Sequence, residues 1–237
     1  MTPALDVHPV GQRRRKRGRP PNPALRAVKH ARMLKAAMEL FIERGYEHVT
    51  VEQIARAAGQ SKGAFYWYFR DKEDCLSQIT GTVASKVEDT VSRELGKGGG
   101  AGEQLLRLTD VATWNPQEFG RYSLLLDSMI FSRSLSVRAL GVKTASHIYQ
   151  SLFKTLRELG TAAAAEAGWA RERIEGFDFD HWAYGCLAFY DGLLEFLNHN
   201  YLNFVPATKA MTRVFHAAFV VPIIGERALR KHEQAGL

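Results

Sequence analysis

Apolar residues recur at three- and four-residue steps along most of the chain beyond residue 25, and no segment alternates with the two-residue period of a strand. This pattern predicts an all-α protein. The expected helices cover 25–44, 51–58, a short segment after Ser61, 71–95, the region around 105–111, a segment that begins at Asn115-Pro116, 135–159, 178–200 and 207–231. Gly160 is expected to end one long helix and Pro222 to kink the last. Residues 161–176 fit either a weak helix or a mobile loop.

A short segment near residue 50 carries the signals of two helices joined by a tight turn. Thr50 precedes an apolar run and Gln53 follows three residues later, so their side chains can cap the open backbone groups reciprocally. Gly59 can adopt the left-handed conformation that ends a helix, and Gln60-Ser61 lead into the second helix. The spacing predicts a helix-turn-helix, whose second helix is shaped to lie in a DNA major groove.

The second of these helices is expected to contain five consecutive aromatic residues, Phe65 to Phe69. At 100° per residue Phe65 and Phe69 face inward, whereas Tyr66 and Trp67 must face solvent. Exposed aromatic rings beside basic residues indicate a partner. The alternative is an ordinary helical hairpin with an irregular aromatic face.

These residues resemble the N-terminal DNA-binding signature of the TetR family of transcriptional regulators. The resemblance covers about 45 residues and rests on Phe41-Ile42, Gly45-Tyr46, Thr50-Val51, Ile54-Ala55, Ala58-Gly59, Ser61-Lys62-Gly63, Phe65-Tyr66, Phe69 and Lys72-Glu73. Gln60 and Tyr68 depart from the residues usual in the family, which bears on operator detail. The composition predicts a basic, disordered arm over 1–24. The helical pattern and the resemblance together predict a three-helix DNA-binding domain over 25–72 and a helical ligand-binding and dimerisation domain over 73–237.

Position and resemblance together suggest roles for residues of this domain. The candidates for phosphate contacts are Thr50, Ser61, Tyr66, Tyr68 and Lys72. The candidates for base edges are Lys62, Gly63, Ala64 and Trp67, the two small residues because they permit close approach. Replacing Lys72 by Ala is expected to weaken binding to all DNA sequences alike and to reduce the salt slope by about one.

The formal charge of +7 is concentrated at the N-terminus. Residues 1–30 hold eight of the 32 basic residues and one of the 25 acidic ones, so the rest of the chain carries 24 of each sign. The stretch around Arg17-Gly18-Arg19-Pro20 resembles an AT-hook, in which Arg17 and Arg19 would enter a narrow minor groove. A basic arm that contacts phosphates nonspecifically fits the sequence equally well.

The helices beyond residue 73 are expected to serve dimerisation and ligand binding. The apolar surface of 178–200 and 207–231 fits either interior helices of a monomer or a four-helix interface between two copies of the chain. The dimer is favoured because two-fold pairing doubles the length of DNA that is read, and the resemblance implies an interface on these two segments. Large side chains that pack imperfectly can enclose a pocket, although for any one of them core packing is the simpler role. The pocket candidates are Trp114, Phe119, Tyr122, Met129, His147, Phe153, Trp182 and Phe189, with His147 or Tyr122 as polar anchor. The expected effector is small and apolar or aromatic.

Other classes of function have weaker support. Cys75 and Cys186 form no CxxC pair, the acids and histidines show no catalytic or metal-ligand spacing, and Gly96–Gly102 lacks the P-loop pattern. We therefore expect no enzyme activity and no cofactor or metal, and a protein of the cytoplasm because no run approaches membrane-spanning length. The sequence favours a repressor that binds a palindromic operator as a homodimer and is released by its effector. The alternative is an architectural protein that binds A·T-rich DNA through its arm.

Overall fold

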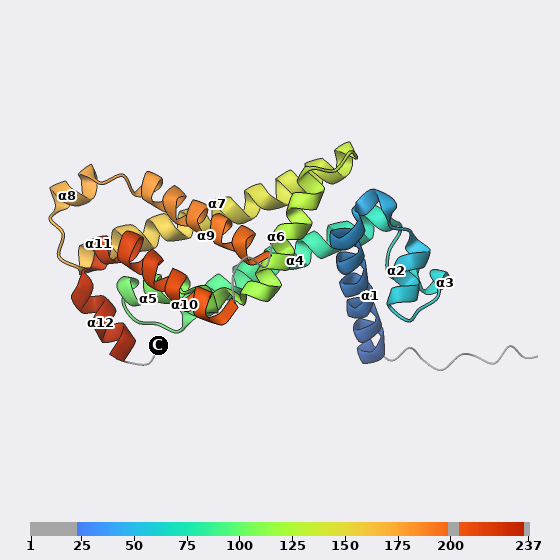
Figure 1. Ribbon diagram of the computed structural model, residues 1–237, viewed down its shortest axis with the longest axis horizontal. Coiled ribbons are helices and arrows are strands. Elements are labelled where there is room, and N and C mark those ends of the chain that lie inside the picture. The colour runs from blue at the N-terminus through green and yellow to red at the C-terminus, as the bar shows by residue number, and fades with distance from the viewer. Residues whose placement is uncertain (1–22, 199–203, 235–237) are drawn as a thin grey trace, which may run out of the picture.

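The structure is a computed structural model that describes residues 23–198 and 204–234, and within these ranges it contains helices and loops and no strand. The all-α prediction is confirmed. The helices are α1 (Pro23–Arg44), α2 (Val51–Ala57), α3 (Lys62–Phe65), α4 (Lys72–Gly96), α5 (Ala101–Leu108), α6 (Pro116–Ile130), α7 (Leu135–Glu166), α8 (Arg171–Gly176), α9 (Phe179–Asn198), α10 (Phe204–Phe215), α11 (Val221–Ile224) and α12 (Glu226–Gln234). Figure 1 shows α1–α3 at one end of an elongated molecule and α5–α12 in the body.

The small end of the molecule is a three-helix unit. Helix α1 packs across α2 and against the start of α4, and its inward face buries Met33, Ala37 and Phe41. Ile54 from α2 and Phe65 from α3 complete the same core and are fully buried. The small unit is held together mainly by apolar burial, since each such side chain removed from water contributes about 1.5–3 kcal/mol.

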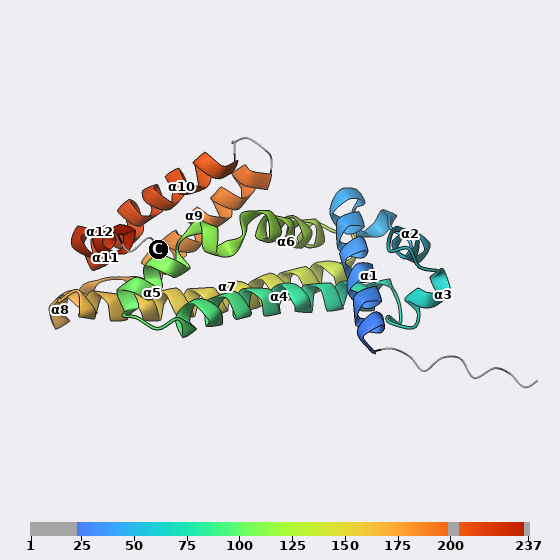
Figure 2. The same ribbon diagram turned by 90° about the horizontal axis from the view of Figure 1, so that it is seen from below.

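Helix α4 connects this unit to the body of the molecule. It begins at the predicted cap, where the Asp71 carboxylate accepts the backbone N–H of Asp74 at 2.7 Å. Its 25 residues run alongside the 32 residues of α7, which Figure 2 shows as two long helices side by side beneath α9 and α10. One continuous helix therefore spans both parts of the chain.

Three expectations about helices were wrong. Gly160 does not end α7, because its missing side chain lets Trp182 of α9 pack against the helix: a Cβ atom there would lie 2.6 Å from the Trp182 ring. The C-terminal segment is not one kinked helix but α10, a π-helical turn (His216–Val220), α11 and α12. The three- and four-residue spacing of apolar residues in 25–44 also predicts that Val28 faces inward, but Val28 is 48% exposed near the start of α1.

The break between α11 and α12 lies at Gly225, whose φ of 80° is the left-handed conformation that glycine adopts without strain. Residues 161–176, for which the sequence fits either a weak helix or a loop, form the end of α7, a turn and the short α8.

Both cysteines, Cys75 and Cys186, are buried free thiols whose pKa values are raised to about 12 by desolvation.

Candidate DNA-binding face and effector cavity

The turn between α2 and α3 has the geometry that the sequence predicts. The Thr50 hydroxyl accepts the Gln53 backbone N–H at 3.2 Å, and the Gln53 side chain accepts the Thr50 N–H at 2.8 Å, which completes the capping box. Gly59 has a φ of 66°, and the Ser61 hydroxyl caps α3 by accepting the Ala64 N–H at 3.2 Å. Thr50 and Ser61 are exposed, so each hydroxyl retains a proton to donate.

The outer face of α3 and the turn after it exposes aromatic surface to solvent. Phe65 and Phe69 are buried as predicted, whereas Tyr66 is 52% and Trp67 is 79% exposed. A Cβ atom added at Gly63 would meet only the Ser61 hydroxyl, at 3.9 Å. Packing within the protein therefore does not require glycine at position 63, and the face is open to close approach by another molecule.

Two candidate basic contacts are occupied inside the protein. The exposed Lys62 forms an ion pair with Glu52 of α2, which raises the pKa of Lys62 and lowers that of Glu52. The half-buried Lys72 ammonium donates to the carbonyls of Tyr46 at 2.7 Å and Val49 at 2.9 Å, and lies 4.0 Å from the centroid of the Tyr46 ring. Lys72 thus ties the turn after α1 to the start of α4.

The remaining candidates on this domain divide by placement. Ala64 is half-buried in the middle of α3. Tyr68 is half-buried and packs beside the His30 ring of α1, with ring centroids 5.5 Å apart. Arg17 and Arg19 lie outside the described residues, as does the rest of the expected arm.

The body of the molecule contains an apolar cavity of about 150 Å³ between α4, α6, α7 and α9, which is partly open to solvent. Three of the eight predicted residues line it: Trp114, Phe119 and Tyr122. The Tyr122 hydroxyl donates to Glu118 at 2.5 Å. The pKa of Tyr122 is raised mainly by burial and, to a smaller extent, by this hydrogen bond.

The other five predicted pocket residues lie elsewhere. Met129 faces the DNA-binding unit, and His147 is exposed and pairs with Glu88 of α4 at 2.9 Å. Phe153 packs on Tyr184 on the outside of α9. Trp182 packs on α7, and Phe189 packs on the rings of the last helices. Helical periodicity places these residues on apolar faces but does not say which faces surround the cavity.

Sequence reasoning missed the two acids that line this cavity. Asp127 of α6 and Asp191 of α9 come from facing helices, and Asp191 accepts the hydroxyl of Tyr149 at 2.5 Å. Burial raises the pKa of both carboxyls, and Glu195 and Asp191 raise that of Asp127 further. A signal was present: each acid interrupts an apolar stretch, in Leu124–Ile130 and Leu187–Leu194.

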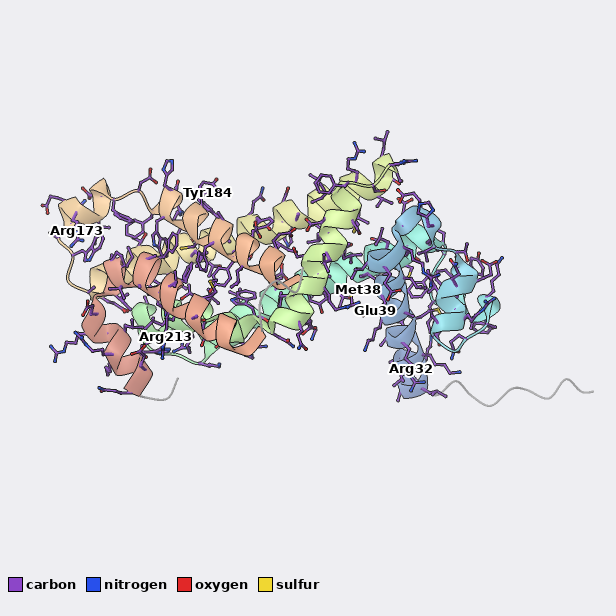
Figure 3. All side chains as sticks on the ribbon, in the orientation of Figure 1. Arg32, Met38, Glu39, Arg173, Tyr184 and Arg213 are labelled. Carbon is purple, nitrogen blue, oxygen red and sulfur yellow. The ribbon has the colours of Figure 1, made fainter. Side chains whose placement is uncertain are left out.

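Helix α6 touches both the cavity and the DNA-binding unit. Its Leu126 lines the cavity, and its Leu125 is fully buried in the cluster that holds the core of α1. Arg121 forms an ion pair with Glu39 of α1, and Met38 packs beside the cavity residues (Figure 3). A movement of α6 therefore displaces side chains at both places.

The turn between α6 and α7 is attached to the DNA-binding unit by one carboxylate. Glu47, in the 3-10 helix Tyr46–His48, accepts the Ser132 hydroxyl, the Arg133 N–H at 3.0 Å and the Ser134 N–H at 3.3 Å. These bonds, that from Ser132 foremost, lower the pKa of Glu47 to about 2. The contact therefore remains ionised at neutral pH.

A capped helix-turn-helix that exposes a glycine on its second helix and aromatic rings in the turn after it defines a protein of the class that binds DNA. Residues 33–79 match the family model described as bacterial regulatory proteins, tetR family. This segment of the chain therefore belongs to the N-terminal DNA-binding domain of the TetR family.

Curated relatives support this assignment over part of their length. The transcriptional regulator AcuR of Cereibacter sphaeroides is 38% identical over 72 residues, which are 30% of this chain and 33% of AcuR. The chain thus matches about a third of that relative's length. The relatives are named as transcriptional regulators.

Solved structures share the fold over most of the chain. The regulatory protein TetR from Rhodobacter sphaeroides is 20% identical, with a TM-score of 0.62 over 81% of this chain and 99% of that one. The MbdR regulator from Azoarcus sp. CIB is 21% identical, with a TM-score of 0.61 over 78% and 96%. Within 23–198 and 204–234 no helix is long and apolar enough to cross a membrane, and no group of residues there is placed to hold a metal ion.

Proposed function

We propose that this chain is a ligand-responsive repressor that binds a palindromic operator as a homodimer and leaves it when a small molecule enters the cavity. The outward face around Gly63, Tyr66 and Trp67 carries the DNA-binding part of the proposal. Contact between an exposed Trp ring and water is unfavourable, and docking against a partner surface such as a DNA groove removes this contact.

The roles proposed for single residues follow from this face. Gly63 and Trp67 face base edges, joined by Lys62 once the ion pair with Glu52 opens. Thr50, Ser61 and Tyr66 donate hydroxyl protons to phosphates. Lys72 holds the unit together, so we assign its effect on DNA to positioning.

Dimerisation through α9 and the C-terminal helices is supported by apolar exposure on them. Tyr184 of α9 is 61% and Val214 of α10 is 54% exposed, and Figure 3 shows Tyr184 on the outer side of its helix. Two copies related by a two-fold axis would cover this surface and set two α3 helices against half-sites about 34–36 Å apart, or a multiple of that distance.

Control by a ligand is supported by the shared position of α6. A molecule in the cavity presses on Tyr122 and Leu126, while Leu125 of the same helix is packed into the core of the DNA-binding unit. A ligand that binds better when α6 is displaced shifts the population toward that arrangement, and α1 and α4 move with it. The spacing of the two α3 helices then no longer fits the operator.

The test is selection of genomic DNA fragments by the purified full chain at near-physiological salt. An enriched inverted repeat, bound with the mass of two chains per site, is the expected result. Trp67→Ala should abolish the enrichment without lowering the melting temperature, because the ring is exposed. Phe131→Ala is the matched control, since Phe131 is 82% exposed and lies outside the helix-turn-helix.

Two results contradict the proposal. Enrichment of A·T-rich DNA with no shared repeat would make the basic N-terminal segment the main binder and favour an architectural protein. Equal loss of binding in the Trp67 and Phe131 variants would show that the outward face of α3 has no special part in recognition.

A further inference from the structure

The cavity has an aromatic wall. Trp114, Phe119, Tyr122, Tyr149 and Tyr190 line it together with aliphatic side chains from α4, α7 and α9. The volume of about 150 Å³ equals that of an engineered protein cavity that takes up benzene. A ligand of this size consists of one ring or a compact apolar body with a short substituent.

The charged groups on the wall are all negative. Asp127 and Asp191 line the cavity from facing helices, whereas no Lys, Arg or His is among the described residues that line it. An anionic ligand would place its charge beside two carboxylates, and no described cation lines the cavity to offset the repulsion.

Neither carboxylate has a cationic partner in the described parts of the chain. Asp191 is bonded to the neutral hydroxyl of Tyr149, and the side chain of Asp127 has no ion pair there. The neighbouring Glu118 differs, because the Lys86 ammonium lies 3.8 Å from its carboxylate. Asp127 is half-buried and Asp191 is exposed, so both remain within reach of water, and their partial desolvation at the cavity wall raises the pKa of each carboxyl.

We propose that the cavity binds a small organic cation, with its ammonium group between Asp127 and Asp191 and its apolar body against the aromatic wall. The ammonium supplies the missing counter-ion and donates to both carboxylates. The aromatic faces attract the same charge through cation–π contacts. The proposal specifies the effector class of the regulator proposed above and rests on it only for the consequence of binding.

The experiment compares isosteric ligands on the full chain by titration calorimetry. Benzylammonium is the probe, phenethylammonium a slightly longer one, benzyl alcohol the neutral control and benzoate the anionic control. We expect the better of the two cations to bind at least tenfold more tightly than benzyl alcohol, and benzoate to bind less tightly than the alcohol.

Variants test the carboxylates directly. Asp127→Asn and Asp191→Asn should each reduce the preference for the cation at least fivefold and leave binding of benzyl alcohol within twofold. Their melting temperatures should stay level or rise, since each removes an uncompensated charge, so a loss of binding is not a loss of folding. Asp89→Asn, an exposed acid of α4 outside the cavity, is the matched control and should change nothing.

The proposal is overturned if benzoate binds as tightly as the better cation. It is also overturned if both Asn variants keep the full preference, or if neither cation binds at millimolar concentration. Measuring DNA binding by the same samples separates this proposal from that of a ligand-responsive repressor. If an ammonium compound binds in the cavity while the protein stays on its operator, the regulatory role is refuted and the proposed ligand class is retained.

Discussion

Lys72 offers the sharpest test of how the DNA-binding unit is held together. Its ammonium donates to the carbonyls of Tyr46 and Val49 and lies over the Tyr46 ring. Replacing Lys72 by Met keeps the length and apolar stem of the side chain and removes the charge and the donors. The turn after α1 then loses its tie to α4.

The expected loss follows from these contacts. Hydrogen bonds to a charged group contribute about 1.5–3 kcal/mol each when buried, and a cation–π contact at a partly exposed site about 0.5–1 kcal/mol. Lys72 is only half-buried, so water replaces part of what is lost and burial itself lowers the pKa of the ammonium. We expect the Lys72→Met variant to lose about 2–3 kcal/mol of its free energy of unfolding, which corresponds to about 4–12 °C in melting temperature for a chain of this size.

The assay pairs thermal unfolding with the salt dependence of operator binding. Each phosphate contact contributes about 0.9 to the slope of log affinity against log salt, so a purely structural Lys72 leaves the slope of the Met variant unchanged. Lys62→Met is the comparison, because that exposed side chain should alter binding without altering stability. A Met variant with wild-type melting temperature and a slope lower by about one would refute the reasoning and restore the phosphate contact that the sequence suggests.

Three further predictions concern other parts of the chain. Gly63→Ala should keep or raise the melting temperature, since alanine favours a helix by about 0.5–1 kcal/mol over glycine, yet weaken operator binding at least tenfold in anisotropy titrations; unchanged affinity would mean that nothing approaches there closely. Glu47→Ala should lower the melting temperature at pH 7, and the gap to wild type should close as the pH falls from about 4.5 toward about 2, because the folded-state pKa is depressed; a gap constant down to pH 3 would contradict this. Gly160→Ala should cost about 1–3 kcal/mol in chemical denaturation, because Trp182 is held by its bond to a backbone carbonyl and cannot easily retreat; wild-type stability would show that it can.

The helix-turn-helix could be predicted from the sequence because its signals are local. The caps at Thr50 and Asp71, the glycine at 59 and the inward pair Phe65 and Phe69 each depend on neighbours within one or two turns. Capping and periodicity rules of this kind can be applied without knowing which helices pack against each other. The structure therefore reproduces all of these features.

The cavity could be predicted only in part because it depends on contacts between helices far apart in the sequence. Gly160 illustrates the limit: its local reading as a helix end is sound, but a Trp from another helix uses the missing side chain as a packing site. Helical periodicity does not tell whether the face that carries His147 lines the cavity or faces solvent, and in the structure His147 pairs with Glu88 on the surface. Asp127 and Asp191 were detectable only as acids within apolar runs.

The bonds of Glu47 bear on how such a protein can be recombined. Consider a chimera joined at position 72, where the sequence suggests a domain boundary. Its α1–α3 unit, taken from another protein, would pack against the loop at 132–134. In this loop one hydroxyl and two backbone N–H groups need a carboxylate as acceptor. We expect such a hybrid to keep its DNA preference and to lose the proposed ligand response unless the donor unit supplies an acid at the equivalent position. The compatibility of the two parts of such a hybrid therefore depends partly on Glu47, a side chain that lies outside both α3 and the cavity.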